Sequence, residues 1–354
     1  SEKRVRRSKV NAGKHQRNIK NEKAKPADDM HPNQSQSEVL AKDLLEKADE
    51  PRPDGFEMII EDLLFQIGIA HSIAQGLISD TDELVISGDG SIMATAASSD
   101  GKPECDCRDN GVYRCDHNRL YTSPTAAWCY DHHHSCFVFG DRYYHLVVTQ
   151  GGHDFPLLTI MPGGNESDYT LSLKAFDRLL KCAEENGLPI RISTFIGDGH
   201  HDSYAHYDYF AAKQVIPIIP LSKNSKPVYP HPSDETVFDT DGVPLCPAGM
   251  RMRHHQFDKG KQTHVFTCPA KRGTHRQGKA VYVFHADECP QAKECKPGST
   301  IGPLIYIKSD ADRRLFPPIP RSGPKFKALA NQRSASERLN SVNDTYNLDG
   351  TCHN

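Results

Sequence analysis

The sequence contains no long apolar run. Its apolar stretches are well short of the roughly 18 residues that a membrane-spanning helix requires. The charged N-terminus is not followed by the apolar segment of a secretory signal. These absences predict a soluble, cytoplasmic chain. With 354 residues, of which 37% are hydrophobic, the chain is long enough to bury the core of one large or two modest domains.

The chain also lacks a general excess of positive charge, since its formal net charge is -3. Its basic residues are instead gathered in two patches. Residues 1–25 hold ten Lys and Arg against two Glu, and residues 251–279 hold eight against one Asp. Each patch has the charge that binds nucleic-acid phosphates, and each can equally be a solvated face. Residues 1–36 are nearly free of large apolar side chains, which predicts a basic, disordered arm.

Disulfides are not expected, although the sequence has eleven cysteines. A large chain without an export signal keeps its thiols reduced or uses them to bind metal. A possible structural zinc site with four thiolates is formed by Cys246, Cys268, Cys289 and Cys295. A second zinc candidate, with the irregular spacing C-x-C-x7-C-x-H, consists of Cys105, Cys107, Cys115 and His117. Ordinary thiols are the alternative for both groups.

Two stretches of similar design end in an aspartate. LVISGDGS at 84–91 is a short apolar run that places Asp89 between two glycines, and IRISTFIGDG at 190–199 presents Asp198 in the same way. Such a pattern predicts a buried strand with a carboxylate at its exposed end. Each aspartate also has a simpler interpretation, because Asp89 can be a turn residue and Asp198 a helix N-cap.

The remaining pattern predicts an α/β chain. Helical spacing of apolar residues predicts helices at 37–48, 56–78, 168–186, 203–214 and 324–342. Strand-like runs at 136–149 and 155–161 predict an antiparallel meander, and the proline-interrupted run 215–221 is expected near a sheet edge. Glu337 lies on the last helix with Arg333 one turn earlier, so both project to one face. The alternative for Glu337 is a solvated helix position.

Three carboxylates from two strands and a helix are enough to hold a pair of Mg²⁺ or Mn²⁺ ions. Magnesium takes few protein ligands and keeps water. Two ions about 3.5 to 4 Å apart stabilise both the attacking and the leaving oxygen of phosphodiester transfer. The three carboxylates can share a pair of ions only if the strands that carry Asp89 and Asp198 are neighbours. The sequence therefore predicts that these two strands lie side by side.

Over roughly residues 56–342 the sequence resembles the DDE transposases of bacterial insertion sequences. The matching text, in order, is LVISGDGS, CDCRDNGVYRCDHNRLYTSPTAAW with the YYHLVV strand, DFPLLTIMPGGNESDY, IGDGHHDSYAHY and RSASERLNS. The resemblance implies a ribonuclease-H-like mixed sheet flanked by helices, with a Cys-containing, partly β insertion before the last catalytic helix. It also implies that Asp89, Asp198 and Glu337 bind two Mg²⁺ or Mn²⁺ ions, activate water for strand nicking and then activate a 3′-hydroxyl for strand transfer.

The sequence pattern and the resemblance together give the expected organisation and partners. The expected parts are an arm at 1–36, a helical segment at 37–80, a catalytic domain at 81–223 and 304–345, an insertion at 224–303 and a tail at 346–354. The expected DNA contacts are Arg333, Arg251, Arg253, Lys271 and Arg272. The partners are the terminal inverted repeats and the target DNA, and the protein is expected to be a nucleoid-associated homodimer on DNA.

A signature of Tyr, two residues, Arg, three residues, Glu, six residues and Lys surrounds the third acid in the cut-and-paste members. This chain has Arg333 and Glu337 at the right separation, but Ala330 stands in the Tyr position and Asp344 in the Lys position. Two alternatives to an active transposase therefore stay open. One is an inactive or truncated remnant that binds DNA, and the other is a nuclease of the same fold that cuts without joining.

Overall fold

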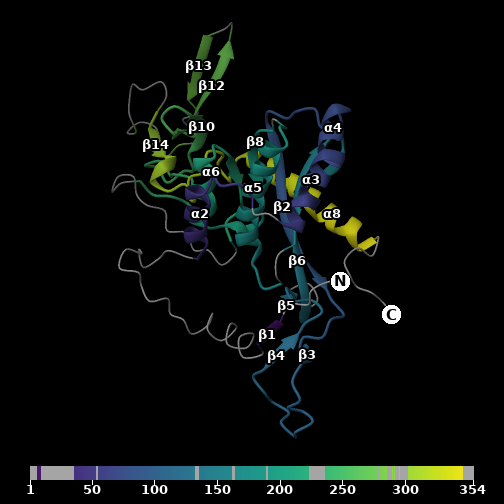
Figure 1. The fold of residues 1–354 in the computed structure, drawn as a ribbon. Helices are drawn as coiled ribbons and strands as arrows, with labels where there is room; N and C mark the ends of the chain where they lie inside the picture. The colour runs from purple at the N-terminus through teal and green to yellow at the C-terminus, as the bar shows by residue number, and fades with distance from the viewer. Residues whose placement is uncertain are drawn as a thin grey trace. The chain divides into compact units, whose positions relative to one another are not determined.

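The protein was analysed as a computed structural model in which the chain forms two compact units. Unit 1 comprises Ser1–Thr81, Gly88–Ile190 and Ser334–Asn354, and unit 2 comprises Asp82–Ser87 and Arg191–Arg333. Strand β2 (Leu84–Ala94), labelled in Figure 1, has its first residues in unit 2 and the others in unit 1. The structure describes residues 6–8, 36–52, 55–131, 135–161, 164–188, 190–222, 236–276, 279–284, 289, 291, 295 and 302–345.

Unit 1 contains antiparallel strands built around the long strand β6 (Cys136–Gln150). The first part of β6 pairs with β5 (Ala127–Asp131), and its last part pairs with β7 (His153–Ile160). The apolar run of β6 is buried where it meets β7, as at Leu146, which faces Leu158 in the register. The antiparallel pairing predicted for 136–149 with 155–161 is therefore confirmed.

Helices pack against these strands. The helices of unit 1 are α2 (Gln36–Glu46), α3 (Phe56–Leu63), the π-helix η1 (Leu64–Ile69), α4 (Ala70–Ala74), α5 (Asp168–Glu185) and α8 (Ser334–Thr345). Both α5 and α8 contact β6 and β7. The predicted helix at 56–78 forms, with a π-helical segment around Gly68, where glycine favours the helix least. Among the described residues, no helix is both long and apolar enough to cross a membrane.

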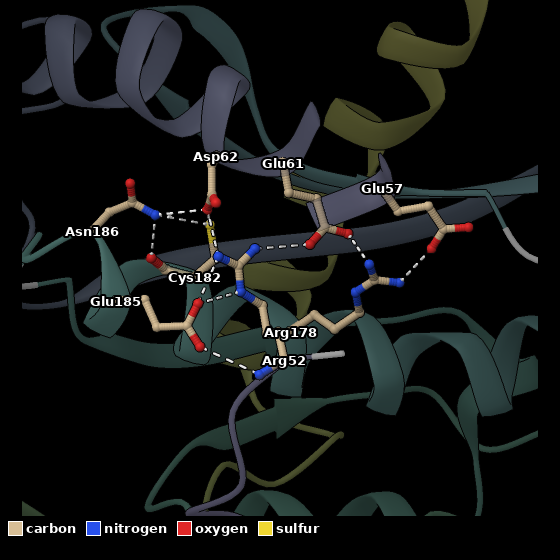
Figure 2. A network of polar contacts seen from close by, with 8 residues as sticks. All are labelled: Arg52, Glu57, Glu61, Asp62, Arg178, Cys182, Glu185 and Asn186. Carbon is tan, nitrogen blue, oxygen red and sulfur yellow. Dashed lines mark hydrogen bonds and ion pairs between the residues drawn. The ribbon is translucent and has the colours of Figure 1, made fainter. Parts of the chain in front are cut away.

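Arg52 lies at the centre of an ion-pair network that joins α3 to α5 (Figure 2). Its Nη1 lies 3.0 Å from Oε2 of Glu61, its Nη2 lies 2.7 Å from Oε2 of Glu185, and it also pairs with Asp62. Arg178 of α5 approaches the other oxygen of Glu61 at 2.6 Å. The Arg52 side chain is only 1% exposed, so these carboxylates replace the water around its charge. The network fastens the segment before α3 to both helices.

A separate three-stranded sheet in unit 1 joins distant parts of the sequence. Its strands are β1 (Arg6–Ser8), β3 (Lys102–Pro103) and β4 (Asn118–Leu120), and β4 pairs antiparallel with both others. Arg6–Ser8, which lies within the arm predicted at 1–36, is a short strand in the structure. Residues 1–5 and 9–35, like the expected tail at 346–354, lie outside the described residues.

Unit 2 contains parallel strands. The start of β2 pairs with β8 (Ile192–Ile196), and β8 pairs with β9 (Ile216–Ile218), both in parallel. Helix α6 (Tyr204–Ala212) connects β8 to β9. Strand β9 ends the strand order, so the edge position predicted for the 215–221 run is confirmed. The parallel strands and the antiparallel strands of unit 1 share β2, and the chain is α/β with a mixed sheet flanked by helices, as predicted.

The insertion in unit 2 is largely β. Strands β10 (Arg253–Asp258), β11 (Thr263–Thr267) and β14 (Leu304–Lys308) form one antiparallel sheet, and β12 (Lys271–Arg276) pairs with β13 (Lys279–Phe284). We expected the chain to rejoin the catalytic domain at residue 304, but β14 pairs with β11 instead. The reason is packing, since Ile307 of β14 is buried in an apolar cluster with Phe266 of β11.

The helix predicted at 324–342 is interrupted. It consists of α7 (Pro324–Ala330), a 3-10 turn at Asn331–Arg333, and α8, which carries Glu337. Pro324 occupies the first turn, as expected for a residue that cannot donate a backbone hydrogen bond. Arg333 therefore does not precede Glu337 on one continuous α-helix, and the face predicted to be shared by the two side chains stays a prediction.

Candidate functional site

Asp89 lies in the middle of β2 and not at an exposed strand end as predicted. Its strand continues to Ala94, and the residue is half-buried. The glycines on either side of Asp89 do not form a turn. They allow other side chains to pack closely against the strand. A Cβ atom at Gly88 would overlap the Tyr144 hydroxyl, and one at Gly90 would lie 2.5 Å from Oδ1 of Asp168. The turn interpretation of Asp89 is therefore excluded, and the two glycines let neighbouring side chains approach the strand on either side of the carboxylate.

The Asp89 carboxylate is in contact with helix α8. Oδ1 accepts a hydrogen bond from the backbone N–H of Gly90 at 3.0 Å. Oδ2 lies 3.5 Å from Nδ2 of Asn340, a residue 251 positions away in the sequence. Asn340 follows Glu337 by three residues, so the two side chains share a helix face. One side chain of the helix that carries the third predicted acid therefore reaches the strand that carries the first.

Asn340 adds an oxygen to this region that the sequence did not suggest. Its Oδ1 atom is buried and has no hydrogen-bond partner among the described residues. A buried carbonyl oxygen without a donor is unfavourable by about 1 to 3 kcal/mol, unless a cation or water completes it. The carboxylate of Asp89 and this carbonyl are both oxygen donors of the kind that hard divalent cations prefer.

Arg338 fixes the position of α8. Its Nε and Nη2 atoms donate hydrogen bonds to Oδ2 and Oδ1 of Asp154 on β7, at 2.7 and 2.8 Å, and its Nη1 donates to Ser334 Oγ at 2.8 Å. Burial raises the pKa of Asp154, but the hydrogen bonds from Arg338 and Thr149 outweigh it and lower the pKa below its ordinary value. Arg338 was not among the predicted site residues, because nothing in the sequence links it to Asp154.

Asp198 occupies the position predicted for it, just beyond the end of β8. It is the N-cap of a 3-10 turn, Gly199–His201, and accepts a hydrogen bond from the backbone N–H of His200 at 2.9 Å. The carboxylate oxygens lie 2.7 Å from Nδ1 of His200 and 2.7 Å from Nδ1 of His201. Burial raises the pKa of Asp198, but the two histidines outweigh it and hold the pKa below its ordinary value.

The N-cap interpretation of Asp198 is thus confirmed, for a 3-10 turn and not for the following helix, which Ser203 caps. The N-cap role of Asp198 is compatible with metal binding, because its carboxylate stays ionised. Asp198 belongs to unit 2, whereas Asp89 and Glu337 belong to unit 1. The convergence of all three acids stays a prediction.

Arg251, a predicted DNA contact, is engaged within the protein. Its Nε lies 2.9 Å from Oδ2 of Asp239, and its Nη2 lies 2.6 Å from Oδ2 of Asp241. The basic character of the 251–279 patch is reduced by these carboxylates, which precede it in the sequence. Asp239 and Asp241 lie outside residues 251–279, so the charge of that segment alone does not reveal that they pair with Arg251.

The other predicted DNA contacts lie in several settings. Arg253 is exposed on β10, and Lys271 is half-buried at the start of β12. Arg272 is the next residue of β12, and its side chain lies outside the described residues. Arg333 is half-buried in the 3-10 turn before α8. Of these four residues, Arg253 is the one whose side chain the structure describes as exposed.

The four cysteines predicted to bind zinc in the insertion come together. They line one small pocket, together with Lys271, although they span fifty positions of the sequence: Cys246, Cys268, Cys289 and Cys295. The first three are buried and the fourth is half-buried. Zinc binding by these four thiols stays a prediction, because among the described residues the group whose ligand atoms lie within reach of one ion is a different one.

The second group of predicted zinc ligands is also assembled. One ligand atom from each of its four residues lies within 4.8 Å of every other: Cys105, Cys107, Cys115 and His117. This cluster, in unit 1, could hold a metal ion such as zinc.

No protein-family model matches this chain, and neither the curated proteins nor the solved structures contain a significant match. The function must therefore be inferred from the motifs of the sequence and from the residues assembled at the site.

Proposed function

We propose that this chain is a DDE-type DNA transposase with a ribonuclease-H-like catalytic domain. It cleaves strands at the ends of its own insertion sequence and joins the resulting 3′ ends to target DNA. The observation that carries the proposal is the contact between Asn340 on α8 and Asp89 on β2 at 3.5 Å. The order of the motifs predicts that Glu337 and Asp89 lie close together in the fold. This contact supports their proximity, although the two residues are far apart in the sequence.

The register of β2 and β8 supports the inclusion of Asp198. Ser87 pairs with Ile196 in parallel, and each aspartate follows its paired residue by two positions. Side chains alternate along a strand, so residues two positions apart point to the same face. The pairing ends at Ser87 and Ile196, and Asp198 lies beyond it at the start of a 3-10 turn, so its approach to Asp89 is part of the proposal.

We infer that the site binds a pair of Mg²⁺ or Mn²⁺ ions, as the resemblance implies. Asp89, Asp198 and Glu337 would hold the ions, and the buried Oδ1 of Asn340 supplies a carbonyl oxygen that has no protein donor among the described residues. When bound, two such ions stabilise the charge on the attacking and leaving oxygens of a phosphodiester. His200 and His201 keep Asp198 ionised, and the pairing of Arg338 with Asp154 holds α8 in place.

The test is strand nicking of donor DNA that carries the terminal inverted repeats flanking the coding region, with Mn²⁺ or Mg²⁺. Asp89→Ala, Asp198→Ala and Glu337→Ala should each lower nicking by at least about a thousandfold, as expected when the charge-stabilising group of a transition state is lost. Glu184→Ala is the matched control, because Glu184 is an exposed carboxylate on α5. Equal backgrounds for wild type and Asp89→Ala would show that the chain is not this enzyme.

A remnant that binds DNA without cutting it is a second candidate, favoured by one observation. Ala330, which replaces the signature Tyr, packs against an apolar cluster containing Ile319 and Phe326, so no hydroxyl is available there. If the chain is such a remnant, it should shift terminal-repeat DNA in a gel and yield no nicked strand. A nuclease of the same fold would give nicked strands, but sequencing would find no joined products.

A further inference from the structure

The loop between β3 and β4 has an interior made of metal-ligand side chains. From residue 104 to residue 118 the structure buries no residue, and the only half-buried ones are Cys105, Cys107 and Cys115. The apolar residues of the loop point outward, with Val112 47% and Tyr113 73% exposed. A loop without an apolar core needs another source of stability, and in small folded segments this is commonly a disulfide or a metal.

The four ligand atoms lie at distances that suit one tetrahedral ion. Sγ of Cys105 lies 3.4 Å from Sγ of Cys115, and Sγ of Cys107 lies 3.2 Å from Nδ1 of His117. No pair among the four is more than 4.8 Å apart. Zinc bonds of about 2.3 Å to sulfur and about 2.0 Å to nitrogen, at tetrahedral angles, place neighbouring ligand atoms roughly 3.5 Å apart.

We infer that Cys105, Cys107, Cys115 and His117 form a structural zinc site that folds the β3–β4 loop. Three thiolates and an imidazole favour Zn²⁺ over the hard ions of a carboxylate site. All four positions are supplied by the protein, which is the arrangement of a structural and not a catalytic zinc. The inference is independent of the proposed transposase activity, since it concerns a different cluster with a different ligand chemistry.

The backbone of the loop is shaped to bring the ligands together. After Cys107 the chain turns back on itself, with the N–H of Gly111 bonded to Arg108 at 3.1 Å and the N–H of Val112 bonded to Cys107 at 2.8 Å. Gly111 has a φ of 77°, which glycine adopts without strain. His117 directly precedes Asn118, the first residue of β4. A bound ion would therefore fix the start of the strand that holds the small sheet together.

The experiment measures zinc in protein purified without a histidine tag and without chelators. Wild type should hold two zinc ions per chain, one in this loop and one in the four-thiol pocket of the insertion. Cys107→Ser should lose one ion per chain, and Cys268→Ser should lose the other. Cys136→Ser is the matched control, because Cys136 is an exposed cysteine outside both groups, and it should keep both ions. A Cys107→Ser protein with the zinc content of wild type would overturn the inference.

A second measurement covers the case in which Cys107→Ser fails to fold. Cobalt exchanged into folded Cys268→Ser should give the thiolate-to-cobalt charge-transfer band and the intense d–d bands of tetrahedral coordination. The alternative of a Cys105–Cys115 disulfide needs a sulfur separation of about 2.05 Å. It would appear as a mass two hydrogens lower and an absence of these bands, and that result would also overturn the inference.

Discussion

Arg338 holds Asp154 with two parallel hydrogen bonds, from Nε at 2.7 Å and from Nη2 at 2.8 Å, and so ties helix α8 to strand β7. Because Glu337 is the adjacent residue on α8, the pairing controls where the third proposed acid is held. A bidentate pair fixes orientation as well as distance. The first prediction follows from this geometry.

Arg338→Ala should lower strand nicking by about a hundredfold while leaving DNA binding near the wild-type level, because misplacement by about 1 Å can cost that much in rate. Arg338→Lys should restore only part of the activity, since an ammonium group cannot make the two-pronged contact. Single-turnover nicking rates and gel-shift affinities provide the comparison. Nicking by Arg338→Ala at the wild-type rate would show that the pairing does not position Glu337.

Asn340→Leu should lower nicking by about tenfold, because leucine has a similar volume but offers no oxygen or N–H group to Asp89. The magnitude corresponds to about 1.4 kcal/mol, within the range of a single lost hydrogen bond. Val342→Ala is the control on the same helix, since Val342 is 47% exposed. If Asn340→Leu and Val342→Ala have equal activity, the contact with Asp89 has no part in the chemistry.

Arg52→Met should destabilise unit 1 by about 3 to 5 kcal/mol, because removal of a buried cation leaves the carboxylates of Glu61, Asp62 and Glu185 uncompensated. Lys42→Met, which removes an exposed ion pair with Glu46, should change the stability by less than about 0.5 kcal/mol. Urea unfolding of both variants measures the difference. Similar midpoints for the two would mean that the network in Figure 2 contributes little.

Acidification should destabilise the fold through His145. Burial lowers the pKa of this histidine from 6.5 to about 4, so the unfolded chain binds a proton more readily than the folded one. The contribution of His145 is complete above pH 6.5 and is lost as the pH falls toward 4, by at most about 1.4 kcal/mol per pH unit. His145→Gln, which can keep a hydrogen bond to Thr159, should flatten this slope of unfolding free energy against pH. His71→Gln, an exposed control on α4, should leave it unchanged.

Elements with strong local patterns could be predicted from the sequence. The apolar spacing of Asp168–Glu185 specified α5 almost to the residue, and the β-branched runs specified β6 and β8. Prolines placed β9 at an edge, since a residue without an N–H cannot serve a central strand. These predictions succeeded because each depends on residues that are close together in the chain.

The remainder depends on contacts between distant residues. The glycines beside Asp89 look like a turn in the sequence, and only Tyr144 and Asp168 show that they serve close packing. The ion pairs of Arg251 and the pairing of Arg338 with Asp154 join positions that no local pattern relates. The break at Asn331–Arg333 was also missed, because that segment contains neither Gly nor Pro to signal it.

The missing side chain at Gly88 has a consequence for how related sequences can vary. A Cβ atom there would occupy the space of the Tyr144 hydroxyl. The same Cβ would lie 2.9 Å from Cζ and 3.0 Å from Cε1 of the Tyr144 ring, so alanine at position 88 is compatible with this backbone only when position 144 carries a side chain smaller than an aromatic ring. The two positions should covary among homologues, with the acid between the glycines unchanged.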